Sequence, residues 1–179
     1  GRTVLFVSHN MGAIISLCDI SLEMGGGKLI YKGSTEKAVS MYTSEKTRGS
    51  SVELINRKDR EGNGPLKISK LSFYDKYMSQ KSSLSAGDEV TFGISYLSEK
   101  RTSLQNVIFE IKIVDQYEQI LCTLSTLLTG ENFNDLAPNG IVYCHVSKLL
   151  LIPGKYYTHL ISYVNNVLSD YVKDATEIN

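Results

Sequence analysis

From residue 65 onward, apolar and polar residues alternate along much of the chain. The clearest case is the run 90–96, Val-Thr-Phe-Gly-Ile-Ser-Tyr, in which every second residue is apolar. Such alternation predicts a strand with one buried face, because successive side chains of a strand point to opposite sides. Similar runs predict strands at 66–74, 105–114, 120–125, 141–146 and 156–164. Short strands at this spacing, separated by turns such as Pro153-Gly154, predict a mainly β fold with an antiparallel β-sandwich over residues 65–179.

Residues 1–44 follow a different pattern, which predicts a small α/β unit. The run 3–8 is almost entirely apolar, as expected of a strand buried on both faces. Asn10 can cap a helix that follows it, and Ser34 can cap a second one. Between these helices, two strand-like runs flank Gly25-Gly26-Gly27 and predict a hairpin.

Residues 45–64 connect these two parts. They are polar and charged and contain glycine, and Val52, Leu54 and Ile55 are too few apolar residues to anchor them to a core. A segment of this composition predicts a flexible linker.

Charge and composition exclude several classes of protein. The 179 residues include 19 basic and 19 acidic side chains and have a formal net charge of zero. Neither a nucleic-acid-binding module nor a polybasic membrane anchor fits this balance. No apolar run approaches the roughly 18 residues of a membrane-spanning helix. The three cysteines lack the spacing of a disulfide framework, which favours a reducing cytoplasm.

His9 is the first candidate for chemistry. It follows the apolar run 3–8 and precedes a predicted helix, and ligands bind at this end of the strands in open α/β sheets. An ATPase needs a group there that senses the γ-phosphate, and a neutral imidazole can donate a hydrogen bond to a phosphate oxygen. Taken alone, a histidine after a strand is more often a capping or surface residue.

The residues around His9 resemble the end of an ABC-transporter ATPase domain. The resemblance rests on the run 1–11, on Cys18-Asp19 and on the run 27–34, Gly-Lys-Leu-Ile-Tyr-Lys-Gly-Ser. It implies that His9 is the switch histidine of the intact ATPase. Ile20, which stands where the family commonly has an arginine, and the glycine-rich turn depart from the family pattern.

The phosphate-binding parts of such an ATPase do not occur in this sequence. Gly27-Lys28 continues with Leu29, so it is no phosphate-binding loop, and neither a signature segment nor an Asp-Glu pair at a strand end is found. Because the chain begins at Gly1, we expect it to be a piece of a longer protein. ATP and magnesium would then bind the parent protein, whereas this piece would hold no cofactor and would be inactive as an ATPase.

The second part resembles a domain found behind the ATPase of Wzt-like exporters. The resemblance rests on 66–74, on Gly87-Asp88-Glu89-Val90 and on 149–156, Leu-Leu-Leu-Ile-Pro-Gly-Lys-Tyr. In ATP-binding subunits of O-antigen or teichoic acid exporters, an immunoglobulin-like sandwich recognises the exported glycan. The resemblance implies that lipid-linked polysaccharide and a transmembrane permease are partners. It also implies a cytoplasmic location, peripheral on the inner face of the bacterial inner membrane.

Aromatic and histidine side chains on the predicted strands are the candidates for glycan binding. Sugar rings have apolar faces that stack on aromatic rings and hydroxyls that need hydrogen-bond partners. The candidates are Tyr117, Tyr143, His145, Tyr157, His159 and Tyr163. Spacing by two predicts that the residues at 143 and 145 share one strand face, as do those at 157, 159 and 163. Each of them can instead be a packing residue.

Other chemistries have weaker support. Glycosidases need two facing carboxylates, and Glu110, Asp115 and Glu118 are available, but sequence does not show that they face each other. We expect no metal site, because Cys144 and His145 are adjacent and point to opposite faces of a strand. Asn132, Asn134, Asp135 and Asn139 can line a loop site or simply form turns.

Two alternatives to glycan recognition remain open at this point. The sandwich can be a non-catalytic module that dimerises the subunit or docks on the permease, or it can be an enzyme acting on the glycan. The resemblance places Asp174-Ala175 just before a final strand, so we expect that strand to be missing at Asn179. An open sheet edge there would favour a homodimer formed by strand pairing.

Overall fold

The computed structural model describes residues 4–8, 11–45, 54–81, 84, 87–100, 102–131, 133–152 and 154–178. Its α/β part contains α1 (Met11–Leu17), β1 (Ile20–Gly25), β2 (Lys28–Ser34) and α2 (Thr35–Glu45). The predicted hairpin is confirmed, with Gly25 paired to Lys28. Gly26 and Gly27 form its turn at φ 56° and 76°. Both angles are positive, as a two-residue turn of this hand requires, and glycine adopts them without strain.

The predicted strand at 3–8 is wrong for residues 4–8, which form no strand. Val4, Leu5 and Val7 are 84%, 81% and 87% exposed. A strand buried on both faces needs neighbouring strands on each side, and within 4–8 and 11–45 the only pairing is that of β1 with β2. His9 lies outside the described residues.

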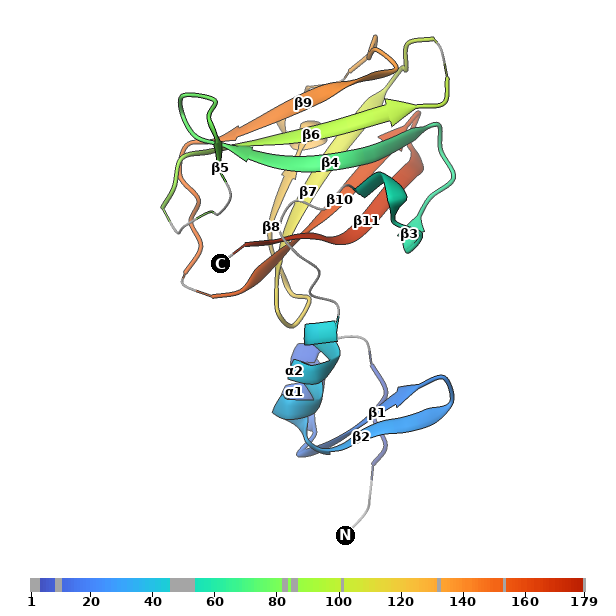
Figure 1. Cartoon of the computed structure of the whole chain (residues 1–179), viewed down its shortest axis with the longest axis vertical. Coiled ribbons are helices and arrows are strands. Elements are labelled where there is room, and N and C mark those ends of the chain that lie inside the picture. Colours follow the sequence, from blue (N-terminus) through green and yellow to red (C-terminus); the bar gives the residue numbers. More distant parts are fainter. Residues whose placement is uncertain are drawn as a thin grey trace.

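Two antiparallel sheets form the β-sandwich, which confirms the mainly β fold class. Figure 1 shows them as two layers, with β9, β6 and β4 in one and β11, β10, β7 and β8 in the other. The five-stranded sheet has the order β3-β11-β10-β7-β8, and the four-stranded sheet the order β5-β4-β6-β9. The elements are η1 (Leu54–Asn56), β3 (Arg60–Glu61), β4 (Leu66–Tyr74), β5 (Gln80–Lys81), β6 (Val90–Ser98), β7 (Val107–Asp115), β8 (Ile120–Ser125), α3 (Thr126–Thr129), β9 (Asn139–Val146), β10 (Tyr156–Val164) and β11 (Val167–Ile178).

The core lies between the sheets and follows the predicted alternation. On β6, Phe92 and Ile94 are buried and point inward. On β7, Phe109 and Ile111 do the same, and the Phe109 ring lies 5.5 Å from that of Tyr96. Six strands predicted from sequence are therefore present, with bounds that match or differ by a few residues.

The predicted linker 45–64 is wrong for its second half. Leu54 is 1% exposed and belongs to the core of the sandwich. Arg60 and Glu61 form β3 and pair with Val172 and Tyr171 of β11. Residues 54–64 are thus part of the sandwich, because one buried leucine and one short strand are enough to hold them.

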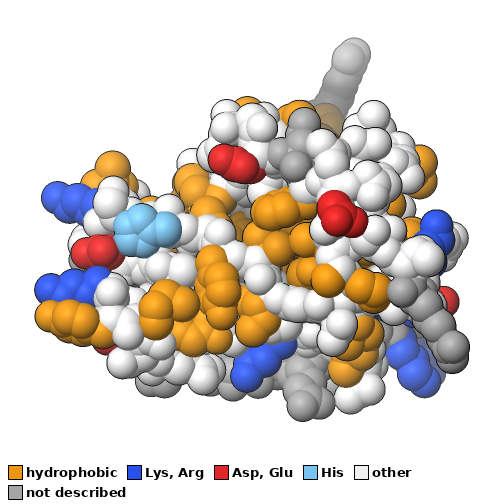
Figure 2. Space-filling model, turned by 90° about the horizontal axis from the view of Figure 1, so that it is seen from above, with side chains coloured by type: hydrophobic (Ala, Val, Ile, Leu, Met, Phe, Trp, Pro, Cys, Tyr) orange, Lys and Arg blue, Asp and Glu red, His pale blue; other side chains and the backbone are white. Residues whose placement is uncertain are grey.

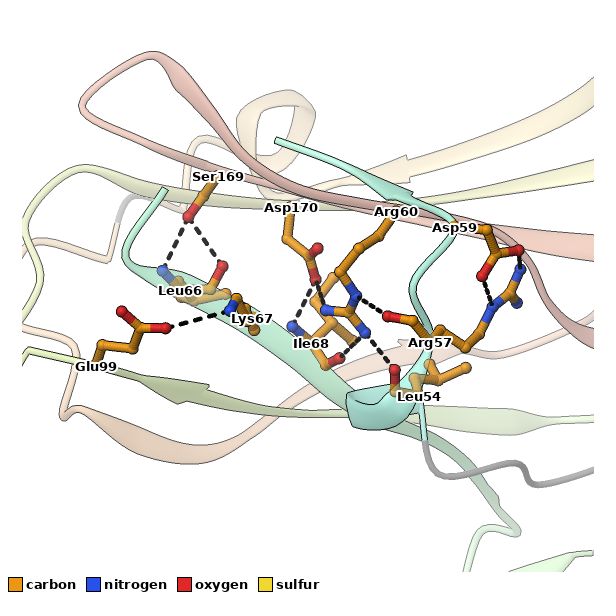
Figure 3. Close-up of polar contacts among 10 residues, drawn as sticks. All are labelled: Leu54, Arg57, Asp59, Arg60, Leu66, Lys67, Ile68, Glu99, Ser169 and Asp170. Carbon is orange, nitrogen blue, oxygen red and sulfur yellow. Dashed lines mark hydrogen bonds and ion pairs between the residues drawn. The ribbon is translucent and has the colours of Figure 1, made fainter. Parts of the chain in front are cut away.

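A buried ion pair anchors this segment to both sheets (Figure 3). The Arg60 guanidinium donates to Asp170 Oδ2 at 2.9 Å, and Asp170 is 1% exposed. The same oxygen accepts the backbone N–H of Ile68 on β4 at 2.8 Å. Arg60 also donates to the Leu54 carbonyl oxygen. Asp170 therefore joins β11, β4 and the segment 54–64 at one point.

The C-terminal strand also differs from expectation. Asp174 and Ala175 lie inside β11, not before a final strand, and β11 lies between β10 and β3. Beside β3, the Gly64 N–H donates to the Ser169 carbonyl oxygen at 3.0 Å, and Arg57 donates to that of Asp174 at 2.9 Å. The segment 57–64 therefore covers the outer side of β11 at residues 169–174, so the expected open edge is not present in this part of the strand.

Among the described helices, none has both the length and the apolar character needed to cross a bilayer.

Candidate functional site

The structure divides the six sequence candidates between the two sheets. Tyr143 and His145 lie on β9 of the four-stranded sheet, and their neighbours Val142 and Cys144 pack against the core. Tyr157, His159 and Tyr163 lie on β10 of the five-stranded sheet. Tyr117 lies in the turn between β7 and β8, where its N–H donates to Asp115 Oδ1 at 2.8 Å. As predicted, residues two apart on each strand share a face. The outer faces of the two sheets point apart, however, so the six candidates cannot form one site.

Two tyrosine rings and a glycine form the centre of the β9 site. The rings of Tyr74 and Tyr143 meet edge to face with their centroids 5.9 Å apart. Gly93 on β6 pairs with Tyr143 on one side and with Ser72 on the other. A Cβ at Gly93 would lie 2.8 Å from the Tyr74 ring and 3.3 Å from that of Tyr143. Both rings can therefore lie over the β6 backbone only because residue 93 has no side chain.

Apolar surface continues beside these rings, and polar groups border it. Tyr143 is 50% exposed and Ile141 on the same strand is 44% exposed. The hydroxyl of Thr91 lies 3.2 Å from His145 Nδ1. His145 Nε2 lies 3.8 Å from Glu89 Oε1, and both of these side chains are about half exposed. Figure 2 shows hydrophobic side chains gathered at the molecular surface, with histidine and acidic side chains near them.

We call the set Tyr74, Glu89, Thr91, Gly93, Ile141, Tyr143 and His145 the tyrosine face. Its chemistry combines an exposed aromatic and aliphatic surface with a hydroxyl, an imidazole and a carboxylate along one margin. Such a surface can stack on a flat apolar ligand and exchange hydrogen bonds with its rim.

His159 on the other sheet belongs to a buried cluster. Only 7% of it is exposed. Its Nδ1 lies 3.1 Å from the Tyr171 hydroxyl and its Nε2 lies 3.3 Å from Asp174 Oδ1. Burial raises the pKa of Tyr171, and the carboxylates of Glu61 and Asp174 add to the effect. Because His159 is buried and its Nδ1 is bonded to Tyr171, it offers a ligand little surface.

Two of the three carboxylates considered for glycosidase chemistry serve other contacts. Asp115 accepts the backbone N–H groups of Tyr117 and Gln119 and so closes the β7–β8 turn. Glu110 accepts the Ser125 hydroxyl at 3.1 Å. Of the loop candidates, Asn132 lies outside the described residues, whereas Asn134 and Asp135 are exposed. Across the described part of the chain, no group of three or more His, Cys, Asp or Glu side chains could hold a metal ion.

Sequence reasoning missed Tyr74 and Gly93. Tyr74 ends β4, and its proximity to Tyr143 depends on the pairing of three strands, which no local pattern shows. Gly93 did carry a signal, because a glycine inside a strand of large side chains often marks the close approach of another group.

One of the comparisons with known proteins shows the family of the chain. The family model "Wzt C-terminal domain" matches residues 57–179. A solved structure described as the crystal structure of the C-terminal domain of wzt superposes with a TM-score of 0.60 at 16% identity, over 74% of this chain and 86% of that one. A search of the curated proteins found no match. The model match begins within the segment 54–64 that the structure joins to the sandwich and covers most of the sequence, and the chain therefore belongs to the Wzt C-terminal domain family.

Proposed function

We propose that this chain is the substrate-recognition part of the ATP-binding subunit of a bacterial polysaccharide ABC exporter, and that its tyrosine face binds the exported glycan. Family membership supports the assignment to the C-terminal domain of an exporter ATPase. The tyrosine face supports glycan binding by its chemistry.

One observation carries the binding proposal: residue 93 is a glycine beneath two tyrosine rings. A glycine inside a strand costs stability, by roughly 0.5–1 kcal/mol relative to alanine in general. At this position it lets the Tyr74 and Tyr143 rings lie close to the sheet and form a shallow apolar platform. The C–H face of a pyranose ring fits such a platform, and sugar hydroxyls would meet His145 and Glu89 at its margin, with the buried Thr91 hydroxyl behind His145.

The exposure of this platform also favours a ligand. Tyr143, Ile141 and Leu97 keep 50%, 44% and 42% of their surface exposed, and they lie on the outer face of neighbouring strands. Stacking a sugar on them would remove apolar surface from water, which is favourable by about 25 cal/mol per Å². The buried His159 cluster offers no comparable gain.

In the parent protein, glycan recognition would be linked to ATP hydrolysis. ATP and magnesium would bind the parent, with His9 acting as its switch histidine. The segment between α2 and η1 tethers the sandwich, so a bound glycan would be held at high effective concentration near the ATPase. We further propose that a transmembrane permease is the partner that receives the lipid-linked polysaccharide, at the inner face of the membrane.

Titration calorimetry with lipid-free O-antigen and teichoic acid fragments tests the proposal. We expect saturable binding by at least one glycan class, with the glycan recovered unchanged. If no glycan binds at millimolar concentration, a permease-docking or dimerising role replaces glycan recognition. If the glycan is shortened or altered during the titration, the chain is an enzyme instead.

A further inference from the structure

Charge is distributed unevenly between the two sheets of the sandwich. The long strands of the four-stranded sheet, β4, β6 and β9, carry Lys67, Lys70 and His145 and contain no aspartate or glutamate. The short strand β5 adds Lys81. In the five-stranded sheet acidic and basic residues are mixed, and the sequence of β11 alone includes three acidic residues and one lysine. Although the whole chain has a net charge of zero, the strands of the four-stranded sheet carry an excess of positive charge.

Lys70 lies on the outer face of this sheet, in the row next to the two tyrosine rings. Its neighbour Leu71 is 3% exposed and belongs to the core, so the Lys70 side chain points the opposite way. Lys70 pairs with Ser95 on β6, which in turn pairs with Ile141 on β9. The next row along β6 is centred on Gly93, about 7 Å from the row of Ser95. The flexible four-carbon stem of a lysine spans a distance of this order, so the Lys70 amine can reach a ligand that lies across Gly93.

Lys70 differs from the other basic residues of the four-stranded sheet in its lack of an anionic partner. Its side chain is partly exposed, and within the part of the chain that the structure describes it forms no ion pair. The other three each lie within 4 Å of a carboxylate, in the pairs Lys67–Glu99, Lys81–Asp88 and His145–Glu89. A cation that no side chain neutralises attracts an anionic ligand more strongly than a paired one does.

We propose that the glycan bound by the tyrosine face is anionic, and that Lys70 binds its carboxylate or phosphate group. The inference rests on the proposed function, which makes the tyrosine face the glycan site. A sugar ring stacked on Tyr74 and Tyr143 would direct a charged substituent, or the neighbouring sugar, toward the row of Lys70. The Ser95 hydroxyl, beside Lys70 in the same row, can donate a hydrogen bond to the same anion.

The one carboxylate of the tyrosine face does not oppose this binding. Glu89 lies six residues before Ser95, which corresponds to about 20 Å along an extended strand. At physiological salt, exposed charges separated by more than about 8 Å are largely screened from each other. The anionic group of the glycan should therefore lie at the Lys70 end of the face, and its neutral hydroxyls at the end formed by His145 and Glu89.

Two ligands that differ only in charge test this inference. An oligosaccharide containing acidic sugars is compared, by calorimetric titration, with its carboxyl-reduced form, which has the same backbone and no charge. We expect the acidic form to bind about three- to tenfold more tightly at low salt, as an ion pair with a hydrogen bond would give. At about 1 M salt, where the screening length falls to about 3 Å, this difference should largely disappear. A poly(glycerol phosphate) fragment then shows whether phosphate or carboxylate is the preferred anion.

Substitution of Lys70 separates charge recognition from stacking. Lys70→Gln should lower the affinity for the acidic form to that of the neutral form and leave the neutral form unaffected, whereas Lys70→Arg should retain the preference. Lys112→Gln is the matched control, because Lys112 is partly exposed on the outer face of the five-stranded sheet, where it pairs with His159. This variant should bind both forms as wild type does.

The outcomes distinguish this inference from the proposed function. If the neutral form binds as tightly as both anionic fragments, or if Lys70→Gln weakens all of them equally, Lys70 does not recognise charge, and the tyrosine face remains a glycan site. If none of the fragments binds, the proposed function fails and the inference fails with it. Equally tight binding of a single-stranded oligothymidylate would show unselective attraction of polyanions and would also overturn the inference.

Discussion

Asp170→Ala is expected to lower the free energy of unfolding by about 3–5 kcal/mol, because it leaves a buried cation without its partner. The Arg60 side chain is 11% exposed and would lose its ion pair with Asp170. The Ile68 N–H would lose its acceptor as well. Burial raises the pKa of Asp170, while the Ile68 N–H and Arg60 oppose this effect by favouring the carboxylate. Burial of the Asp170 carboxylate is therefore costly in free energy, and its contacts with the Ile68 N–H and Arg60 offset part of this cost. Urea denaturation of the full chain, followed by circular dichroism, measures the change.

Asp59 provides a matched control for this variant. It also pairs with an arginine, Arg57, at 2.6 Å, and this contact lowers its pKa to about 2. Its side chain is 69% exposed, so Asp59→Ala should cost no more than about 1 kcal/mol. Replacing both partners, as Arg60→Met with Asp170→Leu, should cost less than Asp170→Ala alone, since no buried charge then remains. If Asp170→Ala and Asp59→Ala have equal effects, the buried pair does not anchor the segment 54–64.

Tyr74→Ala combined with Tyr143→Ala is expected to weaken glycan binding by a hundredfold or more. An aromatic residue at the centre of a binding surface typically contributes about 2 kcal/mol, which is roughly thirtyfold in Kd for each ring. Both side chains lie on the outer face, and neither belongs to the buried core. Calorimetric titration of the double variant measures the loss, and its thermal midpoint should remain close to that of wild type.

Tyr157→Ala combined with Tyr163→Ala is the control for the tyrosine face. These tyrosines were equal candidates from sequence, but they lie on the outer face of the opposite sheet. Their loss should change Kd by no more than about twofold, since neither ring adjoins Tyr143. An equal loss of affinity in both double variants would show that the binding site is not the tyrosine face.

Sequence predicted the central strands well because their alternation is uninterrupted. It missed β11, which places Ser169, Asp170 and Thr176 in buried positions. Polar residues in a core interrupt the apolar pattern, and hydrogen bonds to residues distant in sequence offset the cost of burying them. Ser169 bonds to Leu66, and Asp170 bonds to Ile68 and Arg60. Asp174, at a φ of 46°, also breaks the period of two where β10 and β11 shift register. The adjacent Asn165-Asn166, both at positive φ, was the local signal of this hairpin.

Other errors came from context that local pattern does not contain. The apolar run 4–8 predicted a buried strand, but among the described residues no strand pairs with it. The segment 54–64 reads as a linker because it is polar, yet Arg60 reaches a carboxylate 110 residues away in sequence. For the candidate site, sequence proposed Tyr143 and His145 by residue type and spacing, together with residues of β10. Their separation from Tyr157, His159 and Tyr163 depends on the assignment of strands to sheets, which sequence did not specify.

We propose that the glycan binds across Gly93 on the outer face of the four-stranded sheet. The most direct measurement is nuclear magnetic resonance of the 15N-labelled chain during titration with a glycan fragment. We predict that the largest amide shifts occur at Gly93, Thr91 and Tyr143 and saturate together, while β10 is unaffected. Shifts centred instead on His159 and Tyr171, or on the loop 133–138, would contradict the account.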